Sequence, residues 1–286
     1  MTNGLKSAWV TSCLAVSLAV GCSSESAMVR QQHKQQLIDT IRQSLLESVE
    51  AEKTAVLAIT DDESRAAADE AKTYEAAVDK ARGALRPLIV ADGRHEEIEK
   101  LDAFDAAWAD LERVDERLLV LAVANTNLKA TQLLSHDGSV ALDHVVDGLS
   151  AMQHTITDPG LLRFVGGAST AALRMQGLLF AHIPSADDAE MARLEQRVEE
   201  LRVQVDGALK SARESNQVSP ELAAATWAAW TEYQRLAAEV VRLSRQNSNV
   251  LSFDVSVHEK RQATKRCLTA LAELETAVDV GPHAPR

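Results

Sequence analysis

"WTEYQRLAAEVVRLSRQNSNVLSFDVSVHEKR" (residues 230–261) decides the fold, because its pattern has already occurred once. The earlier copy, "WADLERVDERLLVLAVANTNLKATQLLSHDG" (108–138), begins 122 residues before it, at Trp108 rather than Trp230. Each copy follows two alanines, has an arginine five residues after the tryptophan, and contains an Asn-Ser/Thr-Asn triplet at the same distance. Self-similarity at a fixed spacing predicts one structural unit that is built twice.

Apolar residues recur every three or four positions in and around both copies, as in helices that pack lengthwise in bundles and coiled coils. The 286 residues include only 12 glycines and six prolines, which leaves long stretches without a helix breaker. The fold class is therefore predicted to be all-α. The clearest stripes are Ala71, Tyr74, Val78, Ala81 and Leu85; Leu101, Phe104, Trp108, Leu111, Leu118 and Ala122; Leu194, Val198, Leu201, Val205 and Ala208; and Ala223, Thr226, Trp230, Tyr233, Ala237, Val240 and Ser244.

Turn signals divide the chain into two halves of four helices each. Thr157-Asp158-Pro159-Gly160 separates the halves, although the sequence leaves open whether a helix runs on through Pro159 and Gly160. Prolines mark helix ends inside the halves, at Pro87, Pro184 and Pro220. The sequence thus predicts two tandem antiparallel four-helix bundles, 29–157 and 158–280, and a disordered tail, 281–286. The expected helices are 29–59, 62–86, one after Gly93, one from the first triplet to Met152, 161–183, 187–214, one from Pro220, and 250–278.

The first 28 residues predict a leader and an anchor. Ala8 to Val20 is an apolar run too short to span a bilayer. It ends in Ala19-Val20-Gly21-Cys22 and a polar tract follows, which resembles the lipobox of bacterial lipoproteins; an ordinary signal peptide is the alternative. The resemblance implies a signal peptide (1–21), lipidation of Cys22, a polar tether (22–28) and a periplasmic location, with Ser23 favouring the outer membrane. Cys267 would then be the one remaining cysteine, without a disulfide partner.

Composition and missing motifs argue against several functions. The net charge of −12 disfavours binding to nucleic acid. The sequence has no glycine-rich phosphate loop, zinc-protease, paired Cys-x-x-Cys or Gly-x-Ser-x-Gly motif, and it lacks the Cys-x-x-Cys-His of covalent haem, so we expect neither an enzyme nor a cofactor. Asp143 and Asp147 share a helix face at i, i+4 with His144 beside them, a spacing that suits a divalent ion, but the second copy lacks the pattern. A solvated helix face is favoured there, and no metal site is predicted.

"LSRQNSNVLSFDVSVHEKRQATKRCLTALAEL" (243–274) resembles the third-to-fourth helix segment of the four-helix-bundle sensor domain of methyl-accepting chemotaxis receptors. In that family an aromatic-bearing helix leads into Ser-Arg-x-Asn-x-Asn and then into a basic, polar helix start. "LAVANTNLKATQLLSHDGSVALDHVVDGL" (121–149) resembles a degenerate version, and the likeness extends over 29–156 and 161–278. Such receptors continue into a second membrane span and a cytoplasmic signalling coiled coil. This chain reaches Arg286 without them, so we expect a module that has no signalling domain of its own.

Five residues are candidate ligand contacts. The resemblance implies that small carboxylates are held by arginines between helices, which makes Arg113 and Arg235 candidates; the alternative is an ion pair on the same helix, for example with Glu112 or Glu116. Asn125 and Asn247 begin the triplets, where asparagine favours turns and caps but could also line a pocket. Trp227 either edges a pocket or fills the core.

Two functions remain from the sequence. The first is a lipid-anchored periplasmic binding or sensory module, which presents a small carboxylate-type ligand or a conformational state to a membrane partner. The second is a structural or adaptor lipoprotein that binds another envelope protein and no small molecule. A homodimer is compatible with either. Polar residues in a groove between helices favour the first function, and an apolar stripe on an outward face favours the second.

Overall fold

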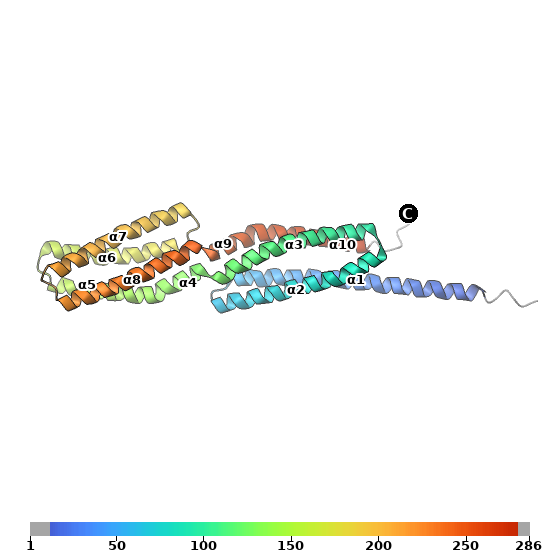
Figure 1. Cartoon of the computed structure of the whole chain (residues 1–286), viewed down its shortest axis with the longest axis horizontal. Coiled ribbons are helices and arrows are strands. Elements are labelled where there is room, and N and C mark those ends of the chain that lie inside the picture. Colours follow the sequence, from blue (N-terminus) through green and yellow to red (C-terminus); the bar gives the residue numbers. More distant parts are fainter. Residues whose placement is uncertain (1–11, 280–286) are drawn as a thin grey trace, which may run out of the picture. The chain divides into compact units, whose positions relative to one another are not determined.

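The computed structural model describes residues 12–279, with side chains described from Ala27 onward, and this part of the chain is helical throughout with no strand (Figure 1). The all-α prediction is confirmed. The predicted signal peptide, the side chain of Cys22 and the tail 281–286 lie outside the described residues or side chains. The helices are α1 (Ser12–Leu57), α2 (Asp61–Asp92), α3 (His95–Ala124), α4 (Thr126–Leu133), α5 (Ser139–Thr155), α6 (Pro159–His182), α7 (Asp188–Glu214), α8 (Pro220–Gln246), α9 (Ser248–Val255) and α10 (Arg261–Asp279), with π-helical turns η1 (Leu134–Gly138) and η2 (Ser256–Lys260).

Helix starts follow the expected capping chemistry. The Asp158 carboxylate accepts from the Leu161 amide, and Pro159 begins α6, so the chain breaks there and no helix runs through. Ser219 caps α8 in the same way, ahead of Pro220. One expected end is wrong. Pro87 lies inside α2, which continues to Asp92 and stops before Gly93, whose φ of 67° suits a helix terminus. Leu85 and Ile89 on either side of Pro87 are fully buried, and this packing offsets the hydrogen bond that a proline removes from a helix.

The chain divides into two compact units that do not coincide with the sequence halves. Unit 1 comprises the chain up to Ala55, Arg65–Arg117 and the chain from Ser256; unit 2 comprises Val56–Ser64 and Leu118–Val255. The predicted bundles 29–157 and 158–280 are therefore corrected. Each half supplies three helices to one unit, while its fourth helix, α5 or α10, belongs to the other.

The asparagine triplets explain this exchange. Asn125 and Asn247 each interrupt helical backbone for one residue, in the left-handed conformation, and the helix resumes at once. An antiparallel reversal needs a loop of about two to five residues. The fourth helix of each half therefore cannot fold back on its own third helix.

Unit 1 is a four-helix bundle of α1, α2, α3 and α10. Its core centres on Trp108, whose side chain is fully buried and whose indole donates to Asp79 Oδ1 at 3.0 Å. This burial agrees with the place of Trp108 in its apolar stripe. The core also contains Ile38, Ile41, Leu45, Val78, Leu85, Ile89, Leu101, Phe104, Leu111, Cys267, Leu271, Leu274 and Val278.

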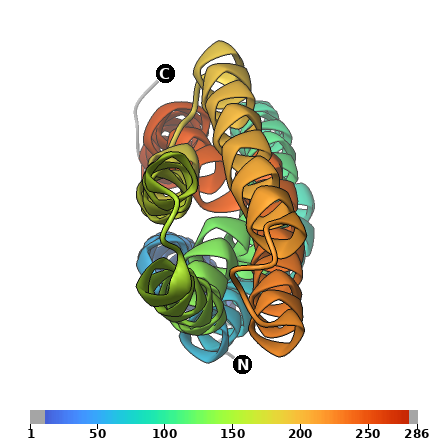
Figure 2. The ribbon, with the colours of Figure 1, turned by 90° about the vertical axis from the view of Figure 1, so that its left-hand side faces the viewer.

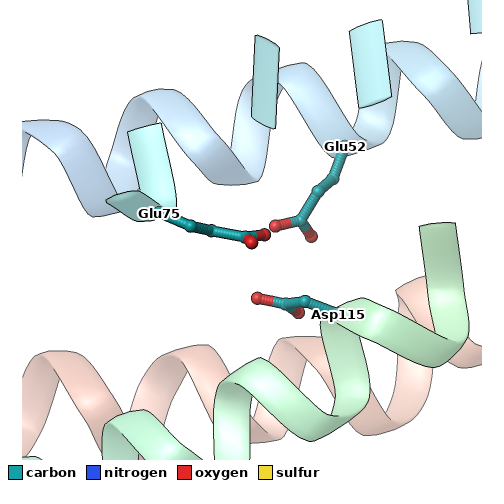
Figure 3. A group of neighbouring side chains, drawn as sticks. All are labelled: Glu52, Glu75 and Asp115. Atoms are coloured by element: carbon teal, nitrogen blue, oxygen red, sulfur yellow. The ribbon is translucent and has the colours of Figure 1, made fainter. Parts of the chain in front are cut away.

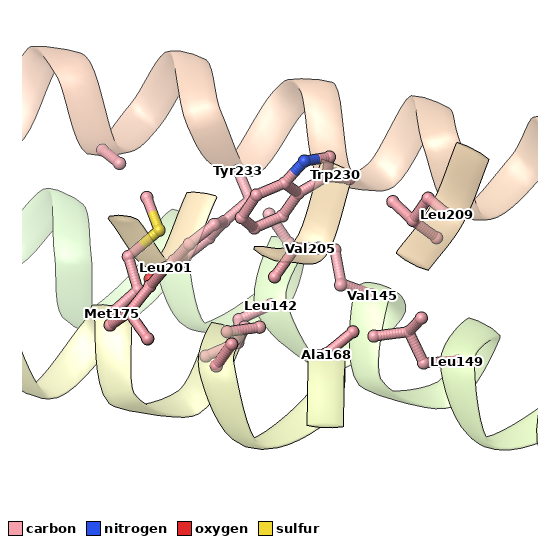
Figure 4. Packing of buried hydrophobic residues seen from close by; sticks show 14 of the residues in the cluster. Leu142, Val145, Leu149, Ala168, Met175, Leu201, Val205, Leu209, Trp230 and Tyr233 are labelled. Atoms are coloured by element: carbon pink, nitrogen blue, oxygen red, sulfur yellow. The ribbon is translucent and has the colours of Figure 1, made fainter. Parts of the chain in front are cut away.

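Unit 2 is a four-helix bundle of α5, α6, α7 and α8, which Figure 2 shows nearly end-on with the α5–α6 and α7–α8 loops toward the viewer. Trp230 lies at its buried centre beside Tyr233, on which it stacks (Figure 4). The Trp230 indole donates to Asp206 Oδ1 at 2.6 Å. The α5–α8 packing is close at Gly148, where an added Cβ would lie 2.7 Å from Thr226 Cγ2. Within the described residues, none of the helices combines the length and apolar character needed to cross a membrane.

Candidate functional site

The two asparagine triplets bind each other inside unit 2, in an arrangement that we call the asparagine junction (125–127 and 247–249). Thr126 N donates to Ser248 Oγ at 2.9 Å, and Ser248 N donates to Thr126 Oγ1 at 3.0 Å. Asn127 N and Asn249 N likewise donate to each other's Oδ1, both at 3.1 Å. Each triplet thus caps the helix that restarts in the other, because the first amides of a helix have no partner within it. Capping is thus present across the junction, but the chain does not reverse at either triplet, as two self-contained four-helix halves would require.

The junction also holds the loop between α6 and α7. Asn127 Nδ2 donates to Asn247 Oδ1 and to Ile183 O, and Asn247 Nδ2 donates to Ser185 O at 2.9 Å. Asn249 Nδ2 donates to Asn125 Oδ1, whereas the buried Nδ2 of Asn125 has no hydrogen-bond partner among the residues that the structure describes. A buried unmade hydrogen bond typically costs about 1–3 kcal/mol. The symmetric network is thus incomplete at one amide, and ligand binding by Asn125 or Asn247 remains a prediction.

His182, which the sequence did not single out, lies in a buried polar network beside the junction. Its Nδ1 is 2.8 Å from Ser244 Oγ, and its Nε2 is 2.9 Å from Glu195 Oε1. The order Ser-His-acid resembles a hydrolase triad, but Ser244 is fully buried and its hydroxyl donates to His182 O. A nucleophile must be reachable by substrate, so this network is structural. His182 continues the 3-4 spacing of the buried residues of α6, so periodicity could have marked its burial, but its polar partners on α7 and α8 are brought to it only by folding.

Three carboxylates and one ammonium meet inside unit 1, in a cluster that we call the acidic centre. Figure 3 shows Glu52 of α1, Glu75 of α2 and Asp115 of α3 pointing toward one another, and one oxygen of each lies within 4.8 Å of the others. Lys260 of η2 places Nζ 2.5 Å from Glu52 Oε2 and also contacts Asp115. The side chains of Glu52, Asp115 and Lys260 are at most 4% exposed.

Burial determines the charge of the acidic centre. It raises the pKa of Asp115 to about 8, against the opposing effect of the Lys260 ammonium, and it raises the pKa of Glu75 as well. Three carboxylates face one ammonium, so a retained proton offsets excess negative charge at neutral pH. Carboxylate oxygens suit a hard divalent cation. Here, however, the Lys260 ammonium is the cation between them, and the residues present fit an ion pair rather than a metal site.

The predicted arginine contacts belong to neither the asparagine junction nor the acidic centre. The side chains of Arg113 and Arg235 are 75% and 62% exposed, and they pair with Asp110 and Glu232 on their own helices. Same-helix pairing is thus what the structure contains, with Asp110 rather than Glu112 or Glu116 as the partner of Arg113. Carboxylate binding by these arginines remains a prediction.

Other candidate residues are placed clearly. Asp143, His144 and Asp147 are exposed on α5, in agreement with a solvated helix face. Trp227 is half-buried, packs against the core of unit 2, and lines a surface pocket together with Arg213. The structure therefore gives Trp227 both of the roles considered, and it adds an arginine that the sequence pattern had not marked.

Comparison with known proteins gives a likeness in fold. No protein-family model matches the chain, and no curated protein matches it in sequence. Among solved structures, the chain is similar to the sensor domain of the histidine kinase sensor TorS of V. parahaemolyticus, with a TM-score of 0.54 and 11% sequence identity. The match covers 89% of this chain and 97% of that chain. The helical arrangement is therefore shared over nearly the whole of both chains.

Proposed function

We propose that this chain is a sensory module of the bacterial cell envelope, anchored through a lipid on Cys22, that passes a conformational change to a membrane partner. The observation that carries the proposal is the asparagine junction. Two helical paths, α3 to α4 and α8 to α9, are each interrupted by one left-handed asparagine, and a π-helical turn follows at the matched position in both. Single-residue breaks and π-turns inside long helices recur at functional hinges.

The fold likeness supports the same proposal by analogy, because the similar solved domain belongs to a histidine kinase sensor. The expected signal peptide would place the chain in the periplasm, where it would present its state to an integral membrane protein. The enzymatic alternative receives no support from the His182 network or from the acidic centre, which are both closed to substrate.

An adaptor function is the second candidate, and one feature of α6 favours it. Leu162, Leu173 and Phe180 are 39%, 53% and 41% exposed, and their spacing places them on one face of the helix. Exposed apolar side chains that share a face are typical of protein-binding surfaces. An adaptor would use this face in one fixed conformation, whereas a sensory module would alternate between two.

Locking the junction distinguishes the two functions. Thr126 Oγ1 and Ser248 Oγ lie 3.2 Å apart, so Thr126→Cys with Ser248→Cys should form a disulfide across the junction. A photo-crosslinking residue at Leu173 then reports contact with a partner in cells, and the same residue at exposed Gln196 on α7 is the control. A sensory module predicts a crosslink to a membrane protein whose yield differs between the oxidised and reduced variant. Equal yields in both states would favour the adaptor, and the absence of any membrane-protein crosslink would contradict the sensory proposal.

A further inference from the structure

A pocket of about 460 Å³ lies in unit 2 where α7 ends and α8 begins. Arg213 and Asn216 provide its polar groups, and Val218, Ala223 and Trp227 provide apolar walls. Val218 and Ala223 are buried, so the floor belongs to the packed core. The loop is fixed in shape by Asn216, which adopts a φ of 55°. Pockets of roughly 300–1,000 Å³ that combine apolar walls with a few polar groups are typical of small-molecule sites.

Arg213 differs from the other arginines of α7 and α8. Each of the other arginines forms an ion pair with a carboxylate; these are Arg193, Arg197, Arg202, Arg235, Arg242 and Arg245. Arg213 forms no ion pair with any described residue, because Leu209, Lys210, Asn216 and Gln217 occupy the positions three and four residues away. Its guanidinium instead lies over the ring of Trp227, 5.3 Å from the ring centroid.

Stacking on an aromatic ring restrains a guanidinium while leaving its N–H groups free to donate. A planar fork of this kind matches the two oxygens of a carboxylate. Small side chains extend the apolar surface beside it, since Ala224 and Ala228 also line the pocket. The pocket therefore offers one held cationic donor next to an apolar wall.

We propose that this pocket binds a small organic monoacid, whose carboxylate is held by Arg213 and whose apolar part lies against Trp227. A single charge is favoured because Glu214 and Glu221 flank the pocket in sequence and the chain carries a net charge of −12. Phosphates and polyacids would be repelled more strongly. The proposal goes beyond the sensory function, because the residues that line the pocket are separate from the asparagine junction that carries that function.

Benzoate is a suitable probe, and benzamide is its neutral counterpart of the same shape. The full chain, labelled with ¹⁵N and solubilised in detergent, is titrated with each while the indole N–H resonances are recorded. Trp227→Phe identifies the Trp227 signal. The indoles of Trp108 and Trp230 are internal controls, because both rings are buried in the two cores and their N–H groups donate to Asp79 and Asp206. We expect benzoate to shift the Trp227 resonance saturably and the Trp108 and Trp230 resonances little, and benzamide to bind more weakly.

Arg213→Gln should weaken benzoate binding about tenfold, which corresponds to about 1.4 kcal/mol. Arg193→Gln, on the exposed face of the same helix, should leave binding unchanged. No saturable shift of Trp227, equal binding of benzamide, or equal loss in the two arginine variants would each overturn the proposal. Binding without a crosslinking difference at the junction would leave this site intact and contradict only the sensory function.

Discussion

At the residue scale, the two π-helical turns carry different residues at the same position of the repeat, and the two residues have different roles. Gly138 in η1 and Lys260 in η2 are equivalent in the repeat. A Cβ at Gly138 would lie 3.2 Å from Leu134 Cδ1 and 3.3 Å from Leu133 O, so unit 2 has little room for a side chain there. In unit 1 the same position sends a lysine into the acidic centre. The two halves therefore repeat the backbone conformation at this position but not the side chain or its contacts.

The acidic centre should make the stability of unit 1 depend on pH. The pKa of Asp115 is about 8 in the folded chain and near 3.8 when unfolded, so the folded state binds the proton more tightly. The stabilisation is complete below about pH 4 and is lost as pH rises through about 8. Urea unfolding, monitored by hydrogen exchange, should show that the free energy of unfolding of unit 1 decreases across this pH range. Asp115→Asn, which cannot ionise, should flatten the dependence; an unchanged slope would show that Asp115 is not the group responsible.

The matched tryptophans should each support one unit. Trp108 and Trp230 are at most 1% exposed, and truncation of a buried tryptophan typically costs about 3–5 kcal/mol. Trp108→Ala should raise hydrogen exchange in α1, α2, α3 and α10, and Trp230→Ala should raise it in α5, α6, α7 and α8. Half-buried Trp227→Ala is the control and should cost less than Trp230→Ala. If both core variants raised exchange equally in both units, the two cores would not be separate.

At the element scale, close helix packing depends on single glycines. Gly148 of α5 faces Thr226 of α8, and an added Cβ would lie 2.7 Å from Thr226 Cγ2 and 2.9 Å from Thr226 Cβ. Thr226 is itself fixed by donating to Leu222 O. By contrast, a Cβ at Gly177 of α6 would meet nothing within 4 Å.

These two glycines give a prediction of opposite sign. Gly148→Ala should destabilise unit 2, by about 1–3 kcal/mol if it behaves as an overpacked core. Gly177→Ala should stabilise it by about 0.5–1 kcal/mol, because alanine loses less backbone entropy in a helix. Thermal unfolding monitored by circular dichroism measures both. Destabilisation by Gly177→Ala, or tolerance of Gly148→Ala, would show that the α5–α8 spacing differs from the one described.

At the scale of the whole molecule, the exchange of fourth helices ties the two halves together. Unit 1 needs α10 from the second half, and unit 2 needs α5 from the first. Most of unit 2 is one continuous segment, Leu118–Val255, which carries all the helices of that bundle. Neither sequence half contains a complete bundle.

Separate expression should expose this dependence. A polypeptide of residues 118–255 should be helical and unfold cooperatively, because its core residues are all present. Residues 158–280 should fold poorly, since they lack α5 and present α10 without its partners. Circular dichroism and urea titration of the two polypeptides compare them directly. Cooperative unfolding of 158–280 together with disorder of 118–255 would contradict the exchange of fourth helices and support two bundles that follow the sequence halves.

The sequence by itself determined the helices, their buried faces and the repeat. Stripes such as Trp108 with Leu111 and Trp230 with Tyr233 report burial, since a helix must hide one face and the 3.6-residue period shows which. Only the tertiary structure decided which helices pack against one another. An apolar seam fits many other seams, so the pattern could not tell whether α10 packs with α8 or with α1 to α3. The single-residue breaks at Asn125 and Asn247 decided it, through geometry that propensity does not contain. The acidic centre and the Arg213–Trp227 pocket arise in the same way, from residues that only folding brings together: Glu52 and Lys260, for example, lie 208 positions apart.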